Sequence, residues 1–422
     1  MNLDQPFGEA RHGSNDRLHA WLIGIYTVLL VALPTGNVFG LNVKMLAFVP
    51  LFCVTLARAI QRKANPYWML SWLVGLPLLF SFWLFPGQAE QYDLSMALLQ
   101  YRNVMITLAG CWFVSVFIDG DEERMISFAK IVLWSVAAMS ILKMLIVAYC
   151  LLRGVPVSAV MNGIGDSFGI KLMSFELEEA EPGAIGSRIM FTSDLLLAPA
   201  CFAAIATRRI LGFGRPIMIL LIVLYLISAI FSFSRFHWAY CAGAILLGFL
   251  VARGEKVMMM LVIAMAVSSA LFVPAIGDII ALRFASNVVS DSDAPRRTQI
   301  VALKTFFWNA PLQGHGWGTF PRDCIRSELL PYTYEVELLA LFGQIGIVGI
   351  LALATLAVWY FKPLFRLRSR GTAYRLALLC LLMVFVLGGL TNPMLLTSIS
   401  SVSYGFLRAL GEINPSAVCE PA

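Results

Sequence analysis

Apolar residues occupy this chain in long uninterrupted segments, and short polar segments separate them. About twelve of these segments approach the twenty residues that a helix needs to cross roughly 30 Å of hydrocarbon. We expect them at 19–33, 41–57, 67–85, 103–118, 126–150, 189–206, 216–233, 237–252, 257–273, 336–361, 374–390 and 394–410. The pattern predicts an all-α, polytopic helical membrane protein, with residues 1–422 forming a single integral membrane domain.

The composition supports a membrane protein and excludes an ordinary soluble domain. Of the 422 residues, 59% are apolar and 13% are charged, whereas soluble domains carry about 25% charged residues. The net charge of +6 is explained by cytoplasmic loops that meet anionic lipid, so no nucleic-acid partner is expected. The chain also shows no internal repeat and no nucleotide-binding glycine motif.

The distribution of basic residues predicts which ends of the helices face the cytoplasm. With an even number of spans both termini lie on one side, and that side collects most of the Lys and Arg residues of the short loops, which places it in the cytoplasm of a bacterial inner membrane. The loops at 34–40 and 388–393, on the other side, contain neither Lys nor Arg. This topology depends on a break between Phe231 and Trp238, because without it all later segments would invert. The residues on the cytoplasmic side are Arg11, Arg17, Arg58, Arg62, Lys63, Arg124, Lys130, Arg208, Arg209, Arg215, Arg253, Lys256, Lys362, Arg366, Arg368, Arg370, Arg375 and Arg408.

Two long polar segments then face the periplasm, a smaller loop at 153–187 and a large one at 274–335. The large loop contains a predicted helix that starts after Asp293, with Pro295 in its first turn, where a missing N–H costs nothing. Helical spacing places four residues on one face, and apolar residues on the other face suit a helix resting on the bilayer surface. The four residues are Arg297, Val301, Lys304 and Trp308.

A glycine-rich turn follows this helix, which we expect to end at Asn309-Ala-Pro311. Gly314, Gly316 and Gly318 permit a tight turn, and we expect it to expose backbone N–H groups that suit an anion. His315 and Trp317 lie between these glycines.

Three arginines stand at predicted external membrane boundaries: Arg188, Arg235 and Arg297. Converging guanidinium groups would form an anion clamp, since each forks onto phosphate or carboxylate oxygens. The alternative for each is a side chain that reaches the lipid headgroups without further function. Lys143 and Asp194 lie inside predicted spans, where charged residues are candidates for function or for pairing with one another.

Several of these features together resemble the O-antigen ligase and polymerase superfamily of bacterial membrane glycosyltransferases. The specific part covers roughly fifty residues, and the predicted topology extends the likeness over most of the chain. Gly186-Ser-Arg188 and Phe233-Ser234-Arg235 are weaker echoes of the same family. The specific order is Arg297, Trp308-Asn309, Pro311-Leu312, Gly314-x-Gly316-x-Gly318 and Glu337-Leu-Leu-Ala-Leu-Phe-Gly343-Gln-Ile-Gly346-Ile-Val-Gly349.

The resemblance implies a glycosyltransferase that acts at the periplasmic face without metal or cofactor. Its donor would be a glycan linked to undecaprenyl diphosphate, and the hydroxyl of a glycan acceptor would displace the lipid diphosphate. A chain-length regulator and a flippase fit the same pathway as further partners. Arg188, Arg235, Arg297 and Lys304 would bind the diphosphate, with Arg297 also stabilising the departing charge. The residues expected to contact substrate are Gly314, Gly316, Trp317, Tyr332 and Glu337.

The general base and the exact reaction stay open in the sequence. Ligases of this family carry a histidine where this chain has Tyr332, so we expect Glu335 as the base, with His315 second. The missing histidine favours a polymerase of O-antigen, capsule or exopolysaccharide repeats over a ligase that transfers glycan to lipid A-core. A secondary transporter or flippase is the alternative from another class, because twelve spans are also common there.

Overall fold

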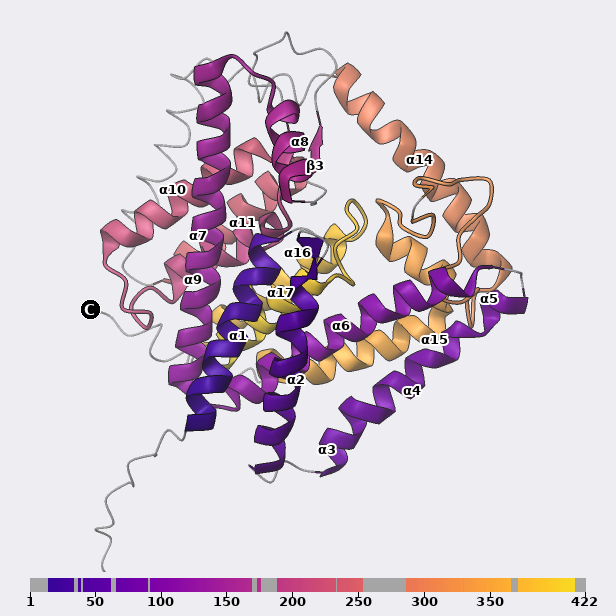
Figure 1. Cartoon of the computed structure of the whole chain (residues 1–422), viewed down its shortest axis with the longest axis horizontal. Coiled ribbons are helices and arrows are strands. Elements are labelled where there is room, and N and C mark those ends of the chain that lie inside the picture. Colours follow the sequence, from indigo (N-terminus) through magenta and orange to yellow (C-terminus); the bar gives the residue numbers. More distant parts are fainter. Residues whose placement is uncertain are drawn as a thin grey trace, which may run out of the picture.

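The computed structural model is helical over most of its length, which confirms the all-α class (Figure 1). It describes residues 14–33, 37–38, 41–61, 66–89, 92–168, 173–175, 188–232, 234–252, 286–328, 330–365 and 371–413. Two small antiparallel hairpins accompany the helices, one pairing β1 (Asn37–Val38) with β2 (Leu41–Asn42), the other pairing β3 (Met173–Phe175) with β4 (Arg188–Met190).

The helical elements follow one another closely along the described chain. They are α1 Ser14–Ala32, α2 Val43–Gln61, α3 Pro66–Leu70, η1 Ser71–Gly75, α4 Leu76–Ser81, η2 Phe82–Leu84, α5 Pro86–Ala89, α6 Leu94–Ile118, α7 Glu122–Arg153, α8 Val157–Phe168, η3 Thr192–Leu196, α9 Leu197–Ala206, α10 Arg215–Phe231, α11 Arg235–Val251, α14 Ser286–Asn309, α15 Glu337–Tyr360, η4 Lys362–Phe365, α16 Thr372–Gly388 and α17 Ser398–Glu412.

These helices match the apolar segments of the sequence, although fewer of them are long enough to cross a membrane. The segment 257–273 lies outside the described residues, and each other predicted segment overlaps a helical element. The break on which the topology depends is present, because α10 ends at Phe231 and α11 begins at Arg235. Within the described residues, the helices with the length and composition of a membrane span are Val43–Gln61, Tyr67–Leu84, Leu94–Ile118, Glu122–Arg153 and Glu337–Tyr360.

The second of these spans is irregular for a reason visible in its sequence. Proline at position 77 lacks an N–H and clashes with the carbonyl four residues earlier, so the regular hydrogen-bond ladder fails there. The π-helical turn η1 lies just before Pro77 and accommodates this interruption. The carbonyl of Pro77 accepts a hydrogen bond from Tyr101 Oη on α6 at 2.9 Å, which ties this span to its neighbour.

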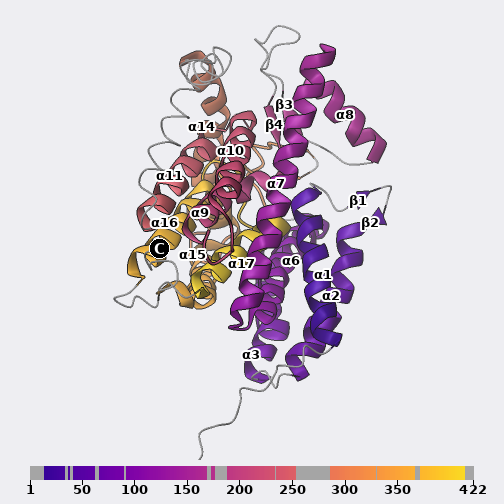
Figure 2. The same ribbon diagram turned by 90° about the vertical axis from the view of Figure 1, so that its left-hand side faces the viewer.

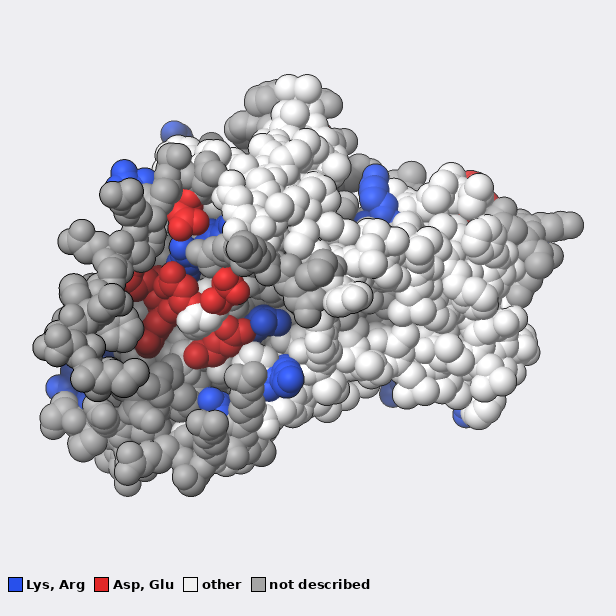
Figure 3. All heavy atoms as spheres, turned by 90° about the horizontal axis from the view of Figure 1, so that it is seen from below, with Lys and Arg blue, Asp and Glu red and all other residues white. Residues whose placement is uncertain are grey.

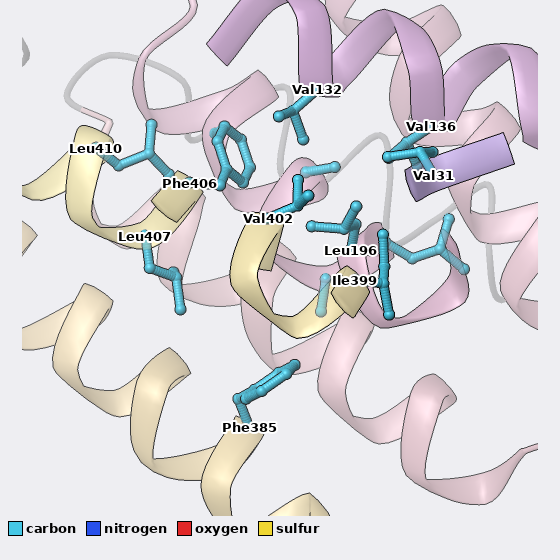
Figure 4. Packing of buried hydrophobic residues seen from close by; sticks show 14 of the residues in the cluster. Val31, Val132, Val136, Leu196, Phe385, Ile399, Val402, Phe406, Leu407 and Leu410 are labelled. Carbon is cyan, nitrogen blue, oxygen red and sulfur yellow. The ribbon is translucent and has the colours of Figure 1, made fainter. Parts of the chain in front are cut away.

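The core is built around α17, whose side chains are buried along most of the helix. Ile399, Val402 and Phe406 pack among apolar side chains of α7, η3 and α16 (Figure 4). Glycines permit the closest approach, because a Cβ at Gly405 would meet Val114 Cγ2 of α6 at 2.8 Å. The predicted span 394–410 is therefore a helix enclosed by other helices of the same chain, a position that apolar length alone does not distinguish from contact with lipid.

Apolar side chains also cover much of the outside. Leu152, Leu250 and Leu351 are among the large apolar residues that stay exposed. Seen from below, acidic and basic side chains gather on one part of the surface, while a wide part of the same face carries almost no charge (Figure 3). Helices α1 and α2 stand side by side at one edge (Figure 2). Such a surface fits a protein whose flanks contact lipid.

Candidate functional site

Helix α14 carries the predicted functional face, and its two sides have different surroundings. Leu303 and Phe306 are buried, and the helix packs on α15, where a Cβ at Gly343 would meet the Phe306 ring at 2.6 Å. The opposite side, with Arg297, Val301, Lys304 and Trp308, is exposed, as the spacing predicted. The apolar side thus rests on α15.

The start of this helix differs from the prediction, whereas its end agrees. We expected it to begin after Asp293 with Pro295 in the first turn, but α14 begins at Ser286 and Pro295 lies inside it. The residues before the proline are Ser, Asn and Asp in large part, which favour caps and turns, so composition alone indicated a later start. The helix ends at Asn309, as Pro311 predicted.

The glycine-rich turn has the predicted backbone conformation but another role. Gly314, Gly316 and Gly318 have φ of 71°, 101° and 75°, values that side chains rarely adopt. The turn is buried, and a Cβ at Gly316 would meet Gly87 N at 2.8 Å and Trp83 O at 2.9 Å. These glycines therefore let the loop press its backbone against helices of the core.

Backbone N–H groups of this turn are not free for an anion. His315 N donates to Gly343 O at 3.0 Å and Gly316 N to Gln344 O at 2.7 Å; the N–H groups of Gly314, Trp317 and Gly318 also have acceptors within the fold. The expectation of exposed amides was wrong, because every one of these N–H groups has an acceptor, and all the acceptors except Ala310 O come from distant parts of the chain. Substrate contacts through Gly314 and Gly316 are likewise not supported by their buried positions.

The turn fits into a break in α15. Gly346 has φ 62° and ψ −174°, which interrupts the helix and leaves backbone groups without their usual partners. Ile347 N and Val348 N donate instead to Pro311 O and Leu312 O at 2.9 and 3.0 Å. Irregular backbone inside an apolar helix is tolerated when the protein itself satisfies it in this way. The glycines of the loop and the glycine of α15 thus form one interlocked unit.

A buried polar network extends this unit to α6. Gln344 Nε2 donates to Thr319 O at 3.0 Å and to Tyr332 O at 3.2 Å. Its Oε1 accepts from Gln100 Nε2 at 2.7 Å, and Gln100 Oε1 accepts from Gly318 N at 2.6 Å. Neither glutamine was predicted from the sequence. Their only signal was a polar amide inside the segment 336–361 for Gln344 and one just before the segment 103–118 for Gln100.

Aromatic donors hold the rest of the loop. Trp317 was expected to contact substrate, but it is 1% exposed and its Nε1 donates to Phe80 O at 2.9 Å. Trp83 Nε1 donates to Gln313 O at 2.7 Å, and Tyr92 Oη donates to Phe320 O at 2.6 Å. These hydrogen bonds hold the segment between α14 and α15 against the core, so side chains on its outer surface can have fixed positions. We call this segment, residues 310–336, the platform.

His315 helps to hold the platform in place and does not line an open site. It is buried, and its ring stacks on Phe306 with centroids 4.0 Å apart. Its Nε2 lies 2.8 Å from Phe306 O, and because a carbonyl only accepts, Nε2 is the donor in that bond. A base needs a free lone pair, so this nitrogen cannot take a proton while the bond is kept. The geometry supports a structural role.

Glu335 lies in the most developed charged cluster of the platform. Its Oε2 accepts from Arg296 Nε at 2.7 Å and its Oε1 from Arg326 at 3.2 Å. Its backbone N donates to Oε1 of the buried Gln299 at 3.0 Å. The three charged side chains remain between 23% and 33% exposed, so the cluster is both fixed and reachable. Glu335 was predicted from the sequence as a functional residue, whereas Arg296 and Arg326 were not.

The proposed cations are placed on different elements. Arg297 and Lys304 lie exposed on α14. Arg235 is half-buried at the first position of α11, after the Ser234 cap. Arg188 begins β4 and pairs by backbone with Phe175 of β3. In Figure 1, α14 stands at one side of the fold and α10 and α11 at the other. The convergence of all these cations on one anion stays a prediction.

Two further residues were expected to contact substrate, Glu337 and Tyr332, and their surroundings in the structure differ. Glu337 accepts from Leu395 N at 2.5 Å and Leu396 N at 3.2 Å, so its carboxylate fixes the segment before α17. Tyr332 is 4% exposed, and its hydroxyl has no hydrogen-bond partner among the described residues. Burial raises the pKa of Tyr332 to about 12, although the charge of Arg102 opposes the shift.

Lys143 and Asp194 form the ion pair that their positions suggested. Lys143 Nζ lies 2.7 and 2.8 Å from the two Asp194 oxygens and also donates to Ser228 O at 3.1 Å. Both side chains are almost fully buried. Asp194 accepts in addition from Phe191 N, directly after β4. This pair joins α7, η3 and α10 in the interior.

No group of His, Cys, Asp or Glu side chains within the described part of the chain could hold a metal ion. Comparison with known protein families and with curated proteins finds no match. The fold itself defines the class of protein: an all-α chain with several helices that could span a membrane.

Proposed function

We propose that this protein is a membrane glycosyltransferase that joins oligosaccharide repeat units carried on undecaprenyl diphosphate. The observation that carries the proposal is the fixed, reachable cluster of Arg296, Glu335 and Arg326 beside the exposed cationic face of α14. These three charged side chains are held by mutual contacts and remain partly exposed, and groups fixed in this way can bind a charged substrate through charge-assisted hydrogen bonds.

The exposed face of α14 suits a sugar phosphate. Arg297 and Lys304 are exposed on the side of α14 opposite to Leu303 and Phe306. Trp308, 64% exposed, lies on the same face. Guanidinium and ammonium groups bind phosphate oxygens, and an indole offers a flat surface to a sugar ring. One helix face thus presents groups for both parts of the donor.

The same residues suit the reaction. The oxygen of an acceptor hydroxyl attacks the anomeric carbon, the bond from that carbon to the diphosphate oxygen breaks, and the lipid diphosphate leaves with the bonding electrons. Arg297 would stabilise the charge on the leaving group. Glu335 would accept the hydroxyl proton on a lone pair that its two arginine partners leave open. Donor binding by Arg188 and Arg235 forms part of the same proposal.

A transporter is the second candidate, and two observations favour it. Transporters use broken helices and buried charges near the membrane centre, and this chain has the break at Gly346 and the pair Lys143–Asp194. In this chain, however, the glycine turn fills the break. We therefore prefer the transferase, whose charged groups remain reachable.

The test is surface polysaccharide from cells that lack the protein and cells that carry variants. Loss of long chains with single repeats retained supports a polymerase, and loss of all attachment to lipid A-core indicates a ligase. Arg297→Ala should abolish long chains while the protein still inserts stably. Arg153→Ala, an exposed arginine at the end of α7, is the matched control. Normal chain length in Arg297→Ala would rule out the proposed role of Arg297.

A further inference from the structure

A second polar site lies at the other end of α6 and α15. The platform meets the beginning of both helices, since Gly318 N bonds to Gln100 and the loop leads into α15 at Glu337. Helix α6 runs for 25 residues to Ile118, about 37 Å at 1.5 Å per residue. Roughly the hydrocarbon thickness of a membrane therefore separates the platform from the far ends of these helices.

A cavity of about 430 Å³ opens at those far ends. Its walls come from α3, η1, the end of α6, the start of α7 and the turn between them, and from α15, η4, α16 and α17. The volume exceeds what one phosphate ion needs and falls in the range of small-molecule sites. The cavity is therefore large enough for a phosphate together with the groups to which it is esterified.

Cations dominate the charged part of the wall. Lys362, Arg375 and Arg408 line the cavity, and Glu412 is the one carboxylate among the lining residues. Arg408 is held in place, because its Nε bonds to Glu412 at 3.0 Å and its NH1 donates to Tyr360 O at 2.8 Å. Lys362 is exposed. This excess of positive charge selects an anion.

Indole rings form the other part of the wall. Trp72 lies 6.3 Å from Trp68 and 5.5 Å from Trp359 between ring centroids, and all three line the cavity. Tryptophan prefers the boundary between lipid and water, because its ring is apolar and its N–H is polar. Next to lysine and arginine, such a wall matches a molecule with an anionic head and an apolar body.

We propose that this cavity binds the phosphate headgroup of an anionic phospholipid. The phosphate would lie against Lys362, Arg375 and Arg408, and the glycerol and the first part of the acyl chains against the tryptophans. Basic pockets between membrane helices recognise anionic headgroups in this manner. The topology that puts the platform outside puts this cavity at the cytoplasmic leaflet. The proposal is independent of glycosyl transfer.

The experiment measures lipid binding by the purified full-length protein in uncharged detergent. Phosphatidylglycerol, phosphatidylcholine and inorganic phosphate are the probes, added separately. We expect phosphatidylglycerol to bind at least about tenfold more tightly than phosphatidylcholine. Lys362→Gln should weaken phosphatidylglycerol binding about fivefold, in line with roughly 1 kcal/mol per basic residue near a membrane surface.

Two further variants separate the cavity from general surface charge. Arg17→Gln removes an exposed cation from α1, at the same end of the protein but outside the cavity, and should leave binding unchanged. Glu412→Gln removes the carboxylate and should tighten binding about fivefold by the same rule. Equal binding of both lipids, or an equal loss in Arg17→Gln, would overturn the proposal. Inorganic phosphate that binds as tightly as phosphatidylglycerol would assign the cavity to a soluble phosphate instead. Polysaccharide length is a separate measurement, so either proposal can fail alone.

Discussion

The pair Lys143–Asp194 and the cluster around Glu335 use the same kinds of charged groups in opposite surroundings. The first is almost wholly buried, with each polar atom directed at a partner from another element. The second keeps between 23% and 33% of each charged side chain exposed. Coulomb attraction is strong in the dry interior and weak near water. We therefore expect substitutions in the interior pair to affect stability most, whereas the platform cluster remains accessible from outside.

Breaking the interior pair should have the largest effect on stability. Lys143→Met leaves Asp194 buried without its cation, which costs about 3–5 kcal/mol in free energy of unfolding. Denaturing-detergent titration of the protein in mixed micelles measures this loss. The double variant Lys143→Met with Asp194→Leu removes both charges and should recover most of it. A loss below about 1 kcal/mol in the single variant would show that the interior pair behaves like a surface pair.

Next in size are changes to the glycines that seat the platform. Gly314→Ala forces a side chain into φ of 71° against the backbone of Gln344, and such strain costs roughly 1–3 kcal/mol before any steric clash. The same titration measures it. Gly243→Ala is the control, because that helical position has open space around it and alanine is favoured there by up to about 1 kcal/mol. Equal stability of the two variants would contradict the close packing of the glycine turn against α15.

These glycines also show which features of the loop can be predicted from the sequence and which cannot. The tight turn was expected from residue type alone, as was the end of α14 at Asn309. The acceptors of Gly316 N and Gly318 N were not, because Gln344 and Gln100 are distant in sequence and only the folded chain brings them near. Local chemistry predicts a turn, whereas the use of its N–H groups depends on tertiary packing.

The helices show the same limit. Apolar length located the helical segments well, since α10, α11 and α15 begin and end close to the predicted residues. It did not separate a helix in lipid from α17, which the other helices enclose. The same limit applies to Glu335: its place at the end of the loop was visible in the sequence, but its bond to Arg296 crosses 39 positions.

A substitution at Tyr332 should change the free energy of unfolding less than Lys143→Met or Gly314→Ala does. Its buried hydroxyl has no partner among the described residues, so Tyr332→Phe should stabilise the protein by about 1 kcal/mol at neutral pH. Its pKa of about 12 exceeds the ordinary value of about 10, so the folded state keeps a proton that the unfolded state releases. Stability should therefore fall between about pH 10 and 12. Titration at several pH values should show that decline reduced in Tyr332→Phe; destabilisation at neutral pH would indicate a missed hydrogen bond.

The platform cluster should contribute least to stability. Glu335→Gln removes two partly exposed ion pairs, which contribute about 0–1 kcal/mol in such positions. Detergent titration should therefore place this variant near the wild-type protein. A loss comparable to that of Lys143→Met would mean that the cluster supports the fold and that the contrast between the two regions is wrong.

Activity of the purified protein decides the central claim. The wild-type protein and Glu335→Gln are each reconstituted in lipid vesicles with an undecaprenyl-diphosphate-linked oligosaccharide, and product length is read on a gel. Glu328→Gln, an exposed carboxylate in the same loop, is the control. We predict a ladder of repeats from wild type and from Glu328→Gln, and single repeats only from Glu335→Gln. A ladder of the same length and rate from Glu335→Gln would contradict the account.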